Sequence, residues 1–409
     1  MSITDQTNFD PSAVTELPLA GLRIIEISSF VAAPLGGMTL AQLGAEVIRI
    51  DPIGGAQDID RWPLAPDGKS LFWNSLNSGK KSMTLDLRQT EAQEILAELV
   101  CADHPGGGIL LTNMPDRPWN SYATLSAHRA DVIRIALSGN FDGSPAVDYT
   151  INCAGGFAVA TGDSNRPVNH VLPAWDMAAG LYLSTALLAA DRHRTRTGRG
   201  QAIDLALSDV MVAMLGNLGY LADIQINGKT RGAMGNELYG AFGRDFHTKD
   251  GRDIMVVALT ARQWMAISAA TGLAANLPGV SPSGGDLFRA RGAIAAGLEA
   301  WCVERDFDNI SEVFTAHHVL WGPYNDFATF FREDPRCSLE NPLMGKVDQP
   351  GIGPLHVAGS PLRFSQSGTR RGSVAPTLGA DGAGVLRTAL GLTQERIDQL
   401  KSRGILGGN

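Results

Sequence analysis

The feature that most constrains the fold is an apolar run, a small-residue turn, a helical segment and a second apolar run, in that order. "LRIIEISSF" at residues 22–30 reads as a buried strand, "APLGGMTLAQLGA" at 33–45 as a helix, and "EVIRIDP" at 46–52 as the next strand. The pattern recurs more loosely over residues 91–139, as a helix followed by two strands. Such alternation predicts an α/β, Rossmann-like domain with a parallel sheet covered by helices.

The turn after the first strand lacks the G-x-G-x-x-G sequence that cradles the pyrophosphate of nicotinamide and flavin dinucleotides. We therefore expect a Rossmann-like fold that binds a different ligand.

Composition narrows the class of protein. The chain has 409 residues, 44% of them hydrophobic, which is enough for two domains or more. A formal net charge of −8 argues against nucleic acid or an anionic membrane surface as a partner. The four cysteines are scattered, with no spacing typical of a zinc site or a disulfide framework. Since the N-terminus does not resemble a signal peptide and no apolar run approaches the roughly 20 residues that span a bilayer, we expect a cytoplasmic enzyme.

The sequence changes character near residue 224. A hairpin is expected around Asp250-Gly251, followed by a strand and several helices, and the tail returns to strands and loops before a final helix. We assign residues 1–223 to the first part of a large Rossmann-like domain, 224–332 to a smaller α+β domain and 333–409 to a return to the large domain.

A lone carboxylate stands out in the segment Val168 to Val210, whose interior reads as one long amphipathic helix. Asp176 lies at the start of that helix, between Trp175 and Met177. An aspartate there can cap the helix and meet the positive end of its dipole. In partly apolar surroundings it can also act as a nucleophile toward an activated acyl group. The residues alone leave both interpretations open.

Four segments carry a resemblance to a known family. "PLAGLRIIEIS", "AAPLGGMTLAQLGAEVIRID", "GKKSMTLDLR" and "AWDMAAGLYLSTALLAADRHRTRTGRGQAIDLALSDV" resemble the class III (formyl-CoA:oxalate, CaiB-BaiF type) CoA-transferases, a group that includes the α-methylacyl-CoA racemases. The resemblance runs from about residue 17 to the C-terminus. It implies that Asp176 is the catalytic nucleophile, an interpretation compatible with a capping role.

The racemases of this family need an acid–base pair that this sequence lacks. The resemblance places their histidine just before an aspartate in "SPAVDYTINCAGGF", where this chain has Val147 followed by Asp148. Their further acidic partner would fall in "VVALTARQW", which contains no Glu or Asp. Because valine cannot transfer a proton, we favour CoA transfer over racemisation.

A narrower resemblance lies in "RWP", "VDYT", "VNHVLPAWD", "ELYGAFGRDF" and "QPGIG". These segments are similar to family members that move CoA between the two carboxyls of the C5 dicarboxylate mesaconate, in glyoxylate assimilation by the 3-hydroxypropionate route. The resemblance implies intramolecular transfer through an aspartyl anhydride and an aspartyl-CoA thioester, with no metal and no cofactor beyond CoA as part of the substrate.

The resemblance also implies which residues bind CoA. Ser29, Phe30, Val31 and Ala32 follow the first strand, Lys80 and Lys81 are offered to phosphates, and Asn113, Arg117, Ser138 and Gly139 line the rest of the site. A solvated surface is the alternative for the two lysines. Many family members carry a basic residue after the acidic residue of the second strand, where this chain has Asp51 and then Pro52; Arg61 is a candidate to compensate.

A glycine-spaced segment, "RGAMGNELYGAF", resembles the mobile loop that closes over the active site in this family. Gly232, Gly235 and Gly240 would serve as hinges, and Asn236 or Tyr239 would bind a substrate carboxylate. A plain linker between domains is the alternative. His170, six residues before Asp176, is a candidate base, although a structural hydrogen bond is the more common role for such a histidine.

The family further implies a discontinuous large domain and a homodimer of interlocked chains. The expected partner is the CoA thioester of a short dicarboxylic acid, with neither nucleic acid nor membrane. Three alternatives stay open: an intermolecular CoA-transferase, a racemase, and a non-catalytic protein that binds CoA esters.

Overall fold

The structure is a computed structural model that describes residues 17–163, 166–229, 231–276 and 283–408. Two compact units divide the chain. The larger comprises residues up to 151, 171–222 and those from 338 onward, and the smaller comprises 152–170 and 223–337.

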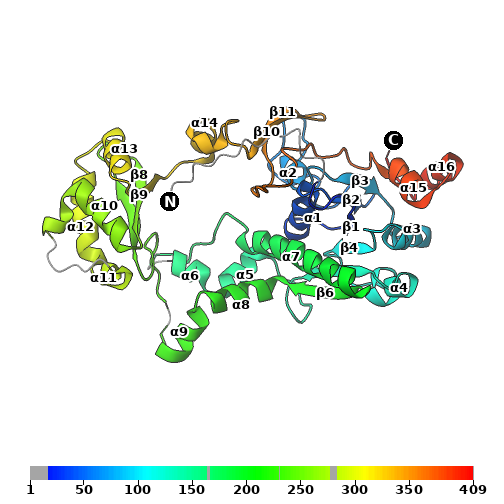
Figure 1. The fold of residues 1–409 in the computed structure, drawn as a ribbon, viewed down its shortest axis with the longest axis horizontal. Coiled ribbons are helices and arrows are strands. Elements are labelled where there is room, and N and C mark those ends of the chain that lie inside the picture. Colours follow the sequence, from blue (N-terminus) through cyan, green and yellow to red (C-terminus); the bar gives the residue numbers. More distant parts are fainter. Residues whose placement is uncertain (1–16, 164–165, 230, 277–282, 409) are drawn as a thin grey trace. The chain divides into compact units, whose positions relative to one another are not determined.

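A six-stranded parallel sheet forms the centre of the larger unit (Figure 1). Its strands are β1 (Arg23–Ile27), β2 (Glu46–Asp51), β3 (Lys81–Thr84), β4 (Ile109–Thr112), β5 (Ile133–Ser138) and β6 (Gln201–Ala206). Their spatial order is β3-β2-β1-β4-β5-β6, the order of doubly wound dinucleotide-binding folds. The expected α/β class and parallel sheet are therefore confirmed.

Helices cover both faces of this sheet. The helices of the larger unit are α1 (Ala32–Gln42), α2 (Leu71–Leu76), α3 (Thr90–Cys101), α4 (Tyr122–His128), α5 (Asp148–Ala154, which ends in the smaller unit), α7 (Ala174–Thr197), α8 (Leu207–Asn217), α15 (Gly382–Leu390) and α16 (Gln394–Ser402), with a short 3-10 turn at Pro118–Asn120. Ile24 of β1 packs with residues of α1 and α7, and its neighbour Ile25 packs on the opposite face with residues of α3, α15 and α16. Both faces are buried, which explains the nearly continuous apolar runs of the strands.

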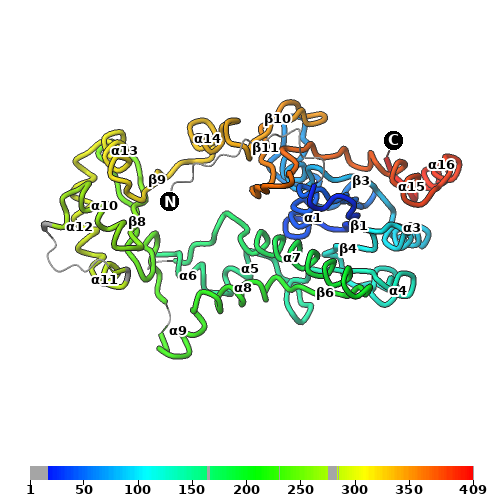
Figure 2. Tube along the Cα trace, viewed as in Figure 1, coloured from blue at the N-terminus to red at the C-terminus, as the bar shows by residue number. Residues whose placement is uncertain are grey.

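The C-terminal segment completes the larger unit. In Figure 2 the red end of the chain lies beside β3 and α3, and Asp381 accepts a hydrogen bond from the Ser82 backbone amide (2.8 Å). A two-stranded antiparallel sheet of β10 (Met344–Gln349) and β11 (Gly353–Ala358) precedes this end.

The prediction of one helix through Val210 is wrong in its C-terminal third. α7 ends at Thr197, where Gly198 adopts a left-handed conformation (φ 69°), and residues 201–206 form β6 before α8 begins. Alanine and leucine occupy both elements, so helical spacing of apolar residues did not distinguish the sheet-edge strand from the helix.

The smaller unit contains a three-stranded antiparallel sheet with helices packed against it. Its elements are α6 (Phe157–Thr161), α9 (Tyr220–Asn227, which begins in the larger unit), β7 (Phe242–His247), β8 (Asp253–Ala258), α10 (Ala261–Thr271), α11 (Gly284–Arg289), α12 (Arg291–Cys302), α13 (Phe307–Ala316), β9 (Leu320–Pro323) and α14 (Phe327–Glu333), with 3-10 turns at Leu273–Asn276 and Pro335–Cys337. β7 and β8 pair around Asp250 and Gly251 as predicted.

One segment groups differently from the sequence-based assignment. Residues 152–170 pack with the smaller unit rather than with the large domain, because the carbonyls of Ala160 and Gly162 accept hydrogen bonds from the amides of Met234 and Gly235 (both 3.1 Å).

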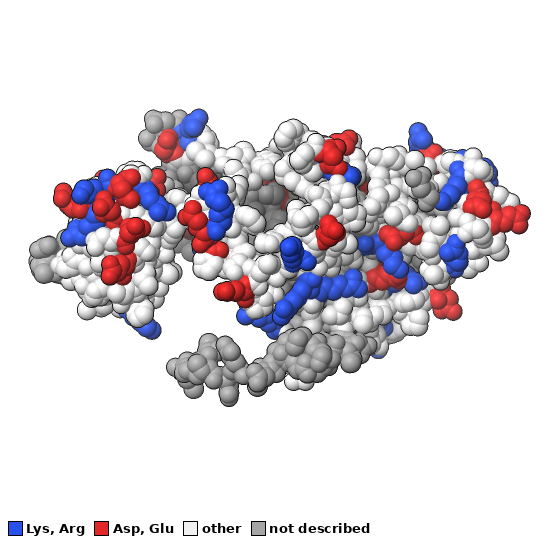
Figure 3. All heavy atoms as spheres, turned by 90° about the horizontal axis from the view of Figure 1, so that it is seen from above, with Lys and Arg blue, Asp and Glu red and all other residues white. Residues whose placement is uncertain are grey.

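Charged side chains of both signs are interspersed on the face shown in Figure 3. Many charged side chains of the described residues are paired, as in Arg129 with Asp131 and Lys81 with Glu46. Over the residues with described positions, no single helix is both long and apolar enough to cross a membrane, and only the bent pair α8 and α9, counted together, meets that test of length and composition.

Candidate active site around Asp176

The loops after β1 and β4 diverge where the strand order of the sheet reverses, the usual ligand-binding position in folds of this kind. Asn113, which follows β4, joins the two loops. Its side-chain oxygen accepts the Ser29 amide (3.1 Å), and its side-chain nitrogen donates to the Ser29 carbonyl (2.9 Å). Asn113 therefore holds the β1–α1 loop in place.

The next residue of that loop has an unusual backbone conformation. Phe30 has φ 67°, in the left-handed region that non-glycine residues seldom occupy. Its amide donates to the buried carboxylate of Asp58 (3.0 Å), which stabilises this conformation. α1 then begins at Ala32, with Val31 as its N-cap residue, and both of these residues are buried.

Asp148 caps the N-terminus of α7. Proline at the N-cap position has no side-chain acceptor, and the buried Asp148 carboxylate replaces one by accepting the amides of Trp175 (2.7 Å) and Asp176 (3.1 Å). The capping role that we considered for Asp176 therefore belongs to Asp148, and Asp176 lies in the first turn of the helix.

The Asp176 carboxylate is partly buried and, among the described residues, accepts no hydrogen bond. Burial raises the pKa of Asp176 to about 6, the negative charge of Asp148 adds to the rise, and the positive charge of Arg61 opposes it. A carboxylate with few solvating partners is a better nucleophile than one in water, and at pH 7 this one is still mostly ionised.

Gly180, one helical turn after Asp176, brings α1 against α7. A Cβ atom at this position would lie 2.7 Å from the Ala32 carbonyl oxygen, closer than such atoms can pack. The absence of a side chain at this position admits the first turn of α1. The close approach places the β1–α1 loop beside the first turns of α7.

Arg61 lies over the rings of Phe72 and Phe30, with its guanidinium carbon 4.5 and 5.6 Å from the two ring centroids. Because its charge acts on Asp176, it belongs to the same site. Asp51 is followed by Pro52, where many family members have a basic residue. Its carboxylate pairs with Arg49 of its own strand (2.8 Å).

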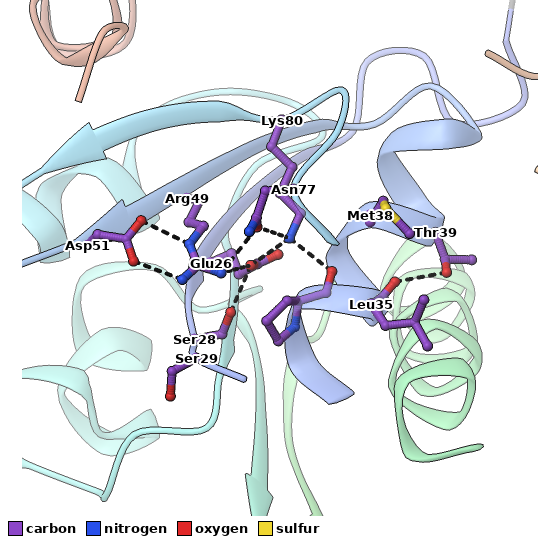
Figure 4. A network of polar contacts seen from close by, with 12 residues as sticks. Glu26, Ser28, Ser29, Leu35, Met38, Thr39, Arg49, Asp51, Asn77 and Lys80 are labelled. Atoms are coloured by element: carbon purple, nitrogen blue, oxygen red, sulfur yellow. Dashed lines mark hydrogen bonds and ion pairs between the residues drawn. The ribbon is translucent and has the colours of Figure 1, made fainter. Parts of the chain in front are cut away.

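The prediction that Lys80 binds phosphate is contradicted by its burial. The Lys80 ammonium donates to Glu26 (2.8 Å), the Pro34 carbonyl (2.9 Å) and Asn77 (2.9 Å), which occupies all three of its hydrogens (Figure 4). Arg49 extends this network to Asp51 and Asp58. Since Asp58 holds the Phe30 amide, Lys80 and Arg49 form part of the support beneath the loop.

Lys81 and Arg117 are not brought to the Asp176 centre by any contact of the described residues. Lys81 is exposed at the amino end of β3 and pairs with Glu46 (2.5 Å). Arg117 is an exposed residue after β4, where its backbone amide donates to Asn120 (2.7 Å). Their contact with CoA phosphates remains a prediction.

A cavity of about 970 Å³ opens at the carboxyl ends of β4 and β5. Asn113, Ser138 and Gly139 line it, so the structure brings together three of the predicted CoA-binding residues. Arg134 also lines it, but its guanidinium is engaged by Asp116 (2.9 Å) and by a backbone carbonyl. The wall also contains the carboxylates of Asp116 and Asp204, and its other side chains are mainly apolar or carry hydroxyl groups.

The glycine-spaced loop lines a second cavity, of about 1000 Å³, within the smaller unit. Gly232, Gly235 and Tyr239 contribute to its wall, and Asn236 is exposed outside the lining set. Gly235 has a positive φ of 55°, as a hinge or tight turn requires, whereas Gly232 does not. Closure of this loop over Asp176 remains a prediction.

His170 belongs to the smaller unit, whereas Asp176 belongs to the larger. The His170 amide donates to the side chain of Asn169 (2.9 Å). A role as a base remains a prediction.

Comparison with known proteins identifies the family. The sequence model of CoA-transferase family III matches residues 19–382, most of the chain. This chain belongs to CoA-transferase family III. It is therefore an enzyme of the kind that the sequence motifs indicated.

Two relatives and one solved structure show which members of family III this chain resembles. It is 48% identical over 400 residues to a 2-methylfumaryl-CoA isomerase from Chloroflexus aurantiacus, which covers 95% of this chain and 98% of the relative. It is 27% identical over 380 residues to a succinyl-CoA:mesaconate CoA-transferase from Haloarcula marismortui, with coverage of 88% and 93%. A CAIB/BAIF family protein from Brucella suis superposes with a TM-score of 0.76 at 25% identity, covering 91% of this chain and 99% of that one.

Sequence reasoning did not assign a role in this family III site to two aspartates, Asp58 and Asp148. Asp58 precedes Arg61 by three residues without any motif of its own, and Asp148 was noted only as the neighbour of Val147. Val147 itself is exposed and cannot transfer protons, and Asp148 has both amide contacts to α7. Only contacts between distant segments reveal these roles.

Proposed function

We propose that this enzyme transfers CoA between the C1 and C4 carboxyls of mesaconate, converting 2-methylfumaryl-CoA to 3-methylfumaryl-CoA with Asp176 as nucleophile. The observation that carries the proposal is the partly buried Asp176 carboxylate at the start of α7, which accepts no hydrogen bond from the part of the chain that the structure describes. The choice of acyl group is supported by the name of the relative at 48% identity.

The reaction proceeds in four exchanges at acyl carbons. The Asp176 carboxylate attacks the C1 thioester, which forms a mixed anhydride and releases the CoA thiolate. The thiolate attacks the aspartyl carbonyl, which gives an aspartyl-CoA thioester and mesaconate. The C4 carboxylate of mesaconate attacks this thioester, and the thiolate is released again as a second anhydride forms. Attack of the thiolate on C4 gives the product and regenerates Asp176. No water, proton or redox equivalent is consumed.

Each tetrahedral intermediate places a negative charge on an oxygen that needs a donor. The amides of Ser29 and Phe30 already donate to Asn113 and Asp58. The amides of Val31 and Ala32 at the N-terminus of α1 have no partner within their helix. We assign the stabilisation of the oxyanion to these two amides.

The CoA moiety is assigned to the cavity at the carboxyl ends of β4 and β5. Val147 and Thr150 line this cavity, and Asp148 between them holds the start of α7, so the cavity adjoins the Asp176 turn. The pantetheine arm of CoA, bound along this wall, would bring the thioester from the cavity to Asp176.

The test supplies purified enzyme with 2-methylfumaryl-CoA alone and follows the products by NMR and mass spectrometry. Appearance of the C4 thioester without an added acceptor supports intramolecular transfer. A parallel reaction contains free ¹³C-labelled mesaconate. Label in the CoA ester would instead indicate intermolecular exchange. Racemase chemistry is tested separately with a saturated 2-methylacyl-CoA in D₂O, where deuterium incorporation at the α-carbon would reveal it.

The Asp176→Ala variant tests the nucleophile. Turnover should fall below a few per cent while the CoA ester still binds. Hydroxylamine trapping and peptide mapping of the wild-type enzyme should locate the acyl adduct on Asp176; an unmodified Asp176 peptide would refute the mechanism.

A further inference from the structure

Arg61 is a cation whose guanidinium donates to none of the residues that the structure describes. Its guanidinium lies over the rings of Phe72 and Phe30, and it donates no side-chain hydrogen bond and forms no ion pair with any residue whose position the structure describes. Arg49, the nearby buried arginine, is fully engaged by Asp51, Asp58 and Asn77. An arginine presents five N–H donors in a fork that matches a carboxylate, and here the fork is available to a ligand.

The position of Arg61 relative to the reacting centre follows from two sets of contacts. Phe30, which lies beneath the guanidinium, belongs to the loop that leads into α1, and the Ala32 carbonyl of that helix contacts Gly180, one turn from Asp176. The charge of Arg61 also opposes the rise in the pKa of Asp176. Arg61 is thus held beside the carboxylate without forming an ion pair with it.

We propose that Arg61 binds the free carboxylate of the dicarboxylyl substrate and so selects CoA esters that carry a second carboxyl group. The proposal rests on the proposed function, because it assigns the specificity of that same site. The two aromatic rings hold the guanidinium in place, which reduces the entropy lost when the carboxylate binds.

Charge balance during the reaction favours a fixed cation at this position. In the resting complex, one negative charge lies on Asp176 and one on the free carboxylate of the substrate. In the aspartyl-CoA state, Asp176 is a neutral acyl group and mesaconate carries both charges. A guanidinium between the two positions stabilises either distribution, and it retains the mesaconate dianion until CoA returns.

The test compares two esters of equal carbon number, succinyl-CoA and butyryl-CoA, which differ in the terminal carboxylate. Binding is measured by calorimetry in the full-length Asp176→Asn protein, so that no turnover occurs, with and without Arg61→Met. Methionine retains an apolar side chain over Phe72 and removes the charge. Because a hydrogen bond to a charged group contributes about 1.5–3 kcal/mol, succinyl-CoA should bind at least about 10-fold more weakly in the Arg61→Met protein.

Butyryl-CoA should bind equally well with and without Arg61. Equal weakening of both esters, or of neither, would overturn the proposal, because Arg61 would then contact the CoA moiety or no ligand. Arg61→Lys, which keeps the charge and loses the fork, should give an intermediate loss for succinyl-CoA alone. Arg305→Ala, which removes another ring-stacked arginine, from the smaller unit, is the matched control and should leave both affinities unchanged.

These measurements separate the inference from the proposed function. If the wild-type enzyme fails to isomerise 2-methylfumaryl-CoA but Arg61 still discriminates succinyl-CoA from butyryl-CoA, the proposed reaction is wrong and the assignment of Arg61 stands.

Discussion

The raised pKa of Asp176 predicts that the nucleophile destabilises the fold at neutral pH. The perturbation is Asp176→Asn, which conserves the size of the side chain and removes its charge. A carboxyl group whose pKa is higher in the folded than in the unfolded chain binds protons more tightly when folded, so its ionisation favours unfolding. The ionised carboxylate is thus a cost to stability that the amide does not impose.

The size of the effect follows from a pKa of 3.8 in the unfolded chain and about 6 in the folded protein. The cost is absent well below pH 3.8, grows between the two pKa values and is complete above pH 6. It reaches about 1 kcal/mol at pH 4.5 and about 3 kcal/mol at pH 8. Any fixed cost of burying the amide is the same at both pH values and cancels in the comparison.

Urea unfolding, followed by the fluorescence of the seven tryptophans, measures this difference at pH 4.5 and pH 8. Relative to wild type, Asp176→Asn should gain about 2 kcal/mol more at pH 8 than at pH 4.5. The control is Asp209→Asn, which removes an exposed carboxylate from the first turn of α8 and should show no such gain. If the wild-type protein and Asp176→Asn keep a constant difference across this range, the carboxylate is not desolvated as described.

Three further predictions concern residues around the nucleophile. Asp148→Asn removes a negative charge, so the pKa of Asp176 should fall from about 6 and the acid limb of the kcat/KM profile should move to lower pH; an unmoved limb would contradict the electrostatic argument. Gly180→Ala places a Cβ 2.7 Å from a carbonyl oxygen of α1 and should lower the free energy of unfolding by about 1–3 kcal/mol, whereas Gly384→Ala, with open space around it, should be tolerated in the same urea assay. Lys80→Met removes the ammonium that pairs with the buried Glu26 (2.8 Å) and should cost about 3–5 kcal/mol in thermal or urea unfolding; a stable variant with a raised KM would instead restore the phosphate-binding role.

Local pattern was sufficient for the four central strands of the sheet and for the position of the nucleophile. The strands at 23–27, 46–51 and 109–112 are apolar on both faces, and such runs separated by helices are typical of a parallel sheet. β3 and β6 were missed because each is short or amphipathic and lies at an edge of the sheet, where burial imposes a weaker pattern.

The sequence pattern did not predict the role of a side chain where that role depends on residues distant in the chain. Lys80 and Lys81 are adjacent in sequence, yet one is buried among acids and the other is exposed beside Glu46. Nothing within a few residues distinguishes them, since the partners of Lys80 come from positions as distant as Glu26.

By itself, the sequence determined the alternation of strands and helices, the family and the residue that the family uses as nucleophile, because each depends on local spacing and residue type. Tertiary structure alone decided that Asp148 caps the helix of Asp176, that Asn113 and Asp58 hold the loop opposite, and that Arg61, whose guanidinium donates to no residue of described position, acts electrostatically on the nucleophile. These are contacts between segments separated by tens of residues, and their energies depend on distance and burial in space, which the order of residues along the chain does not specify.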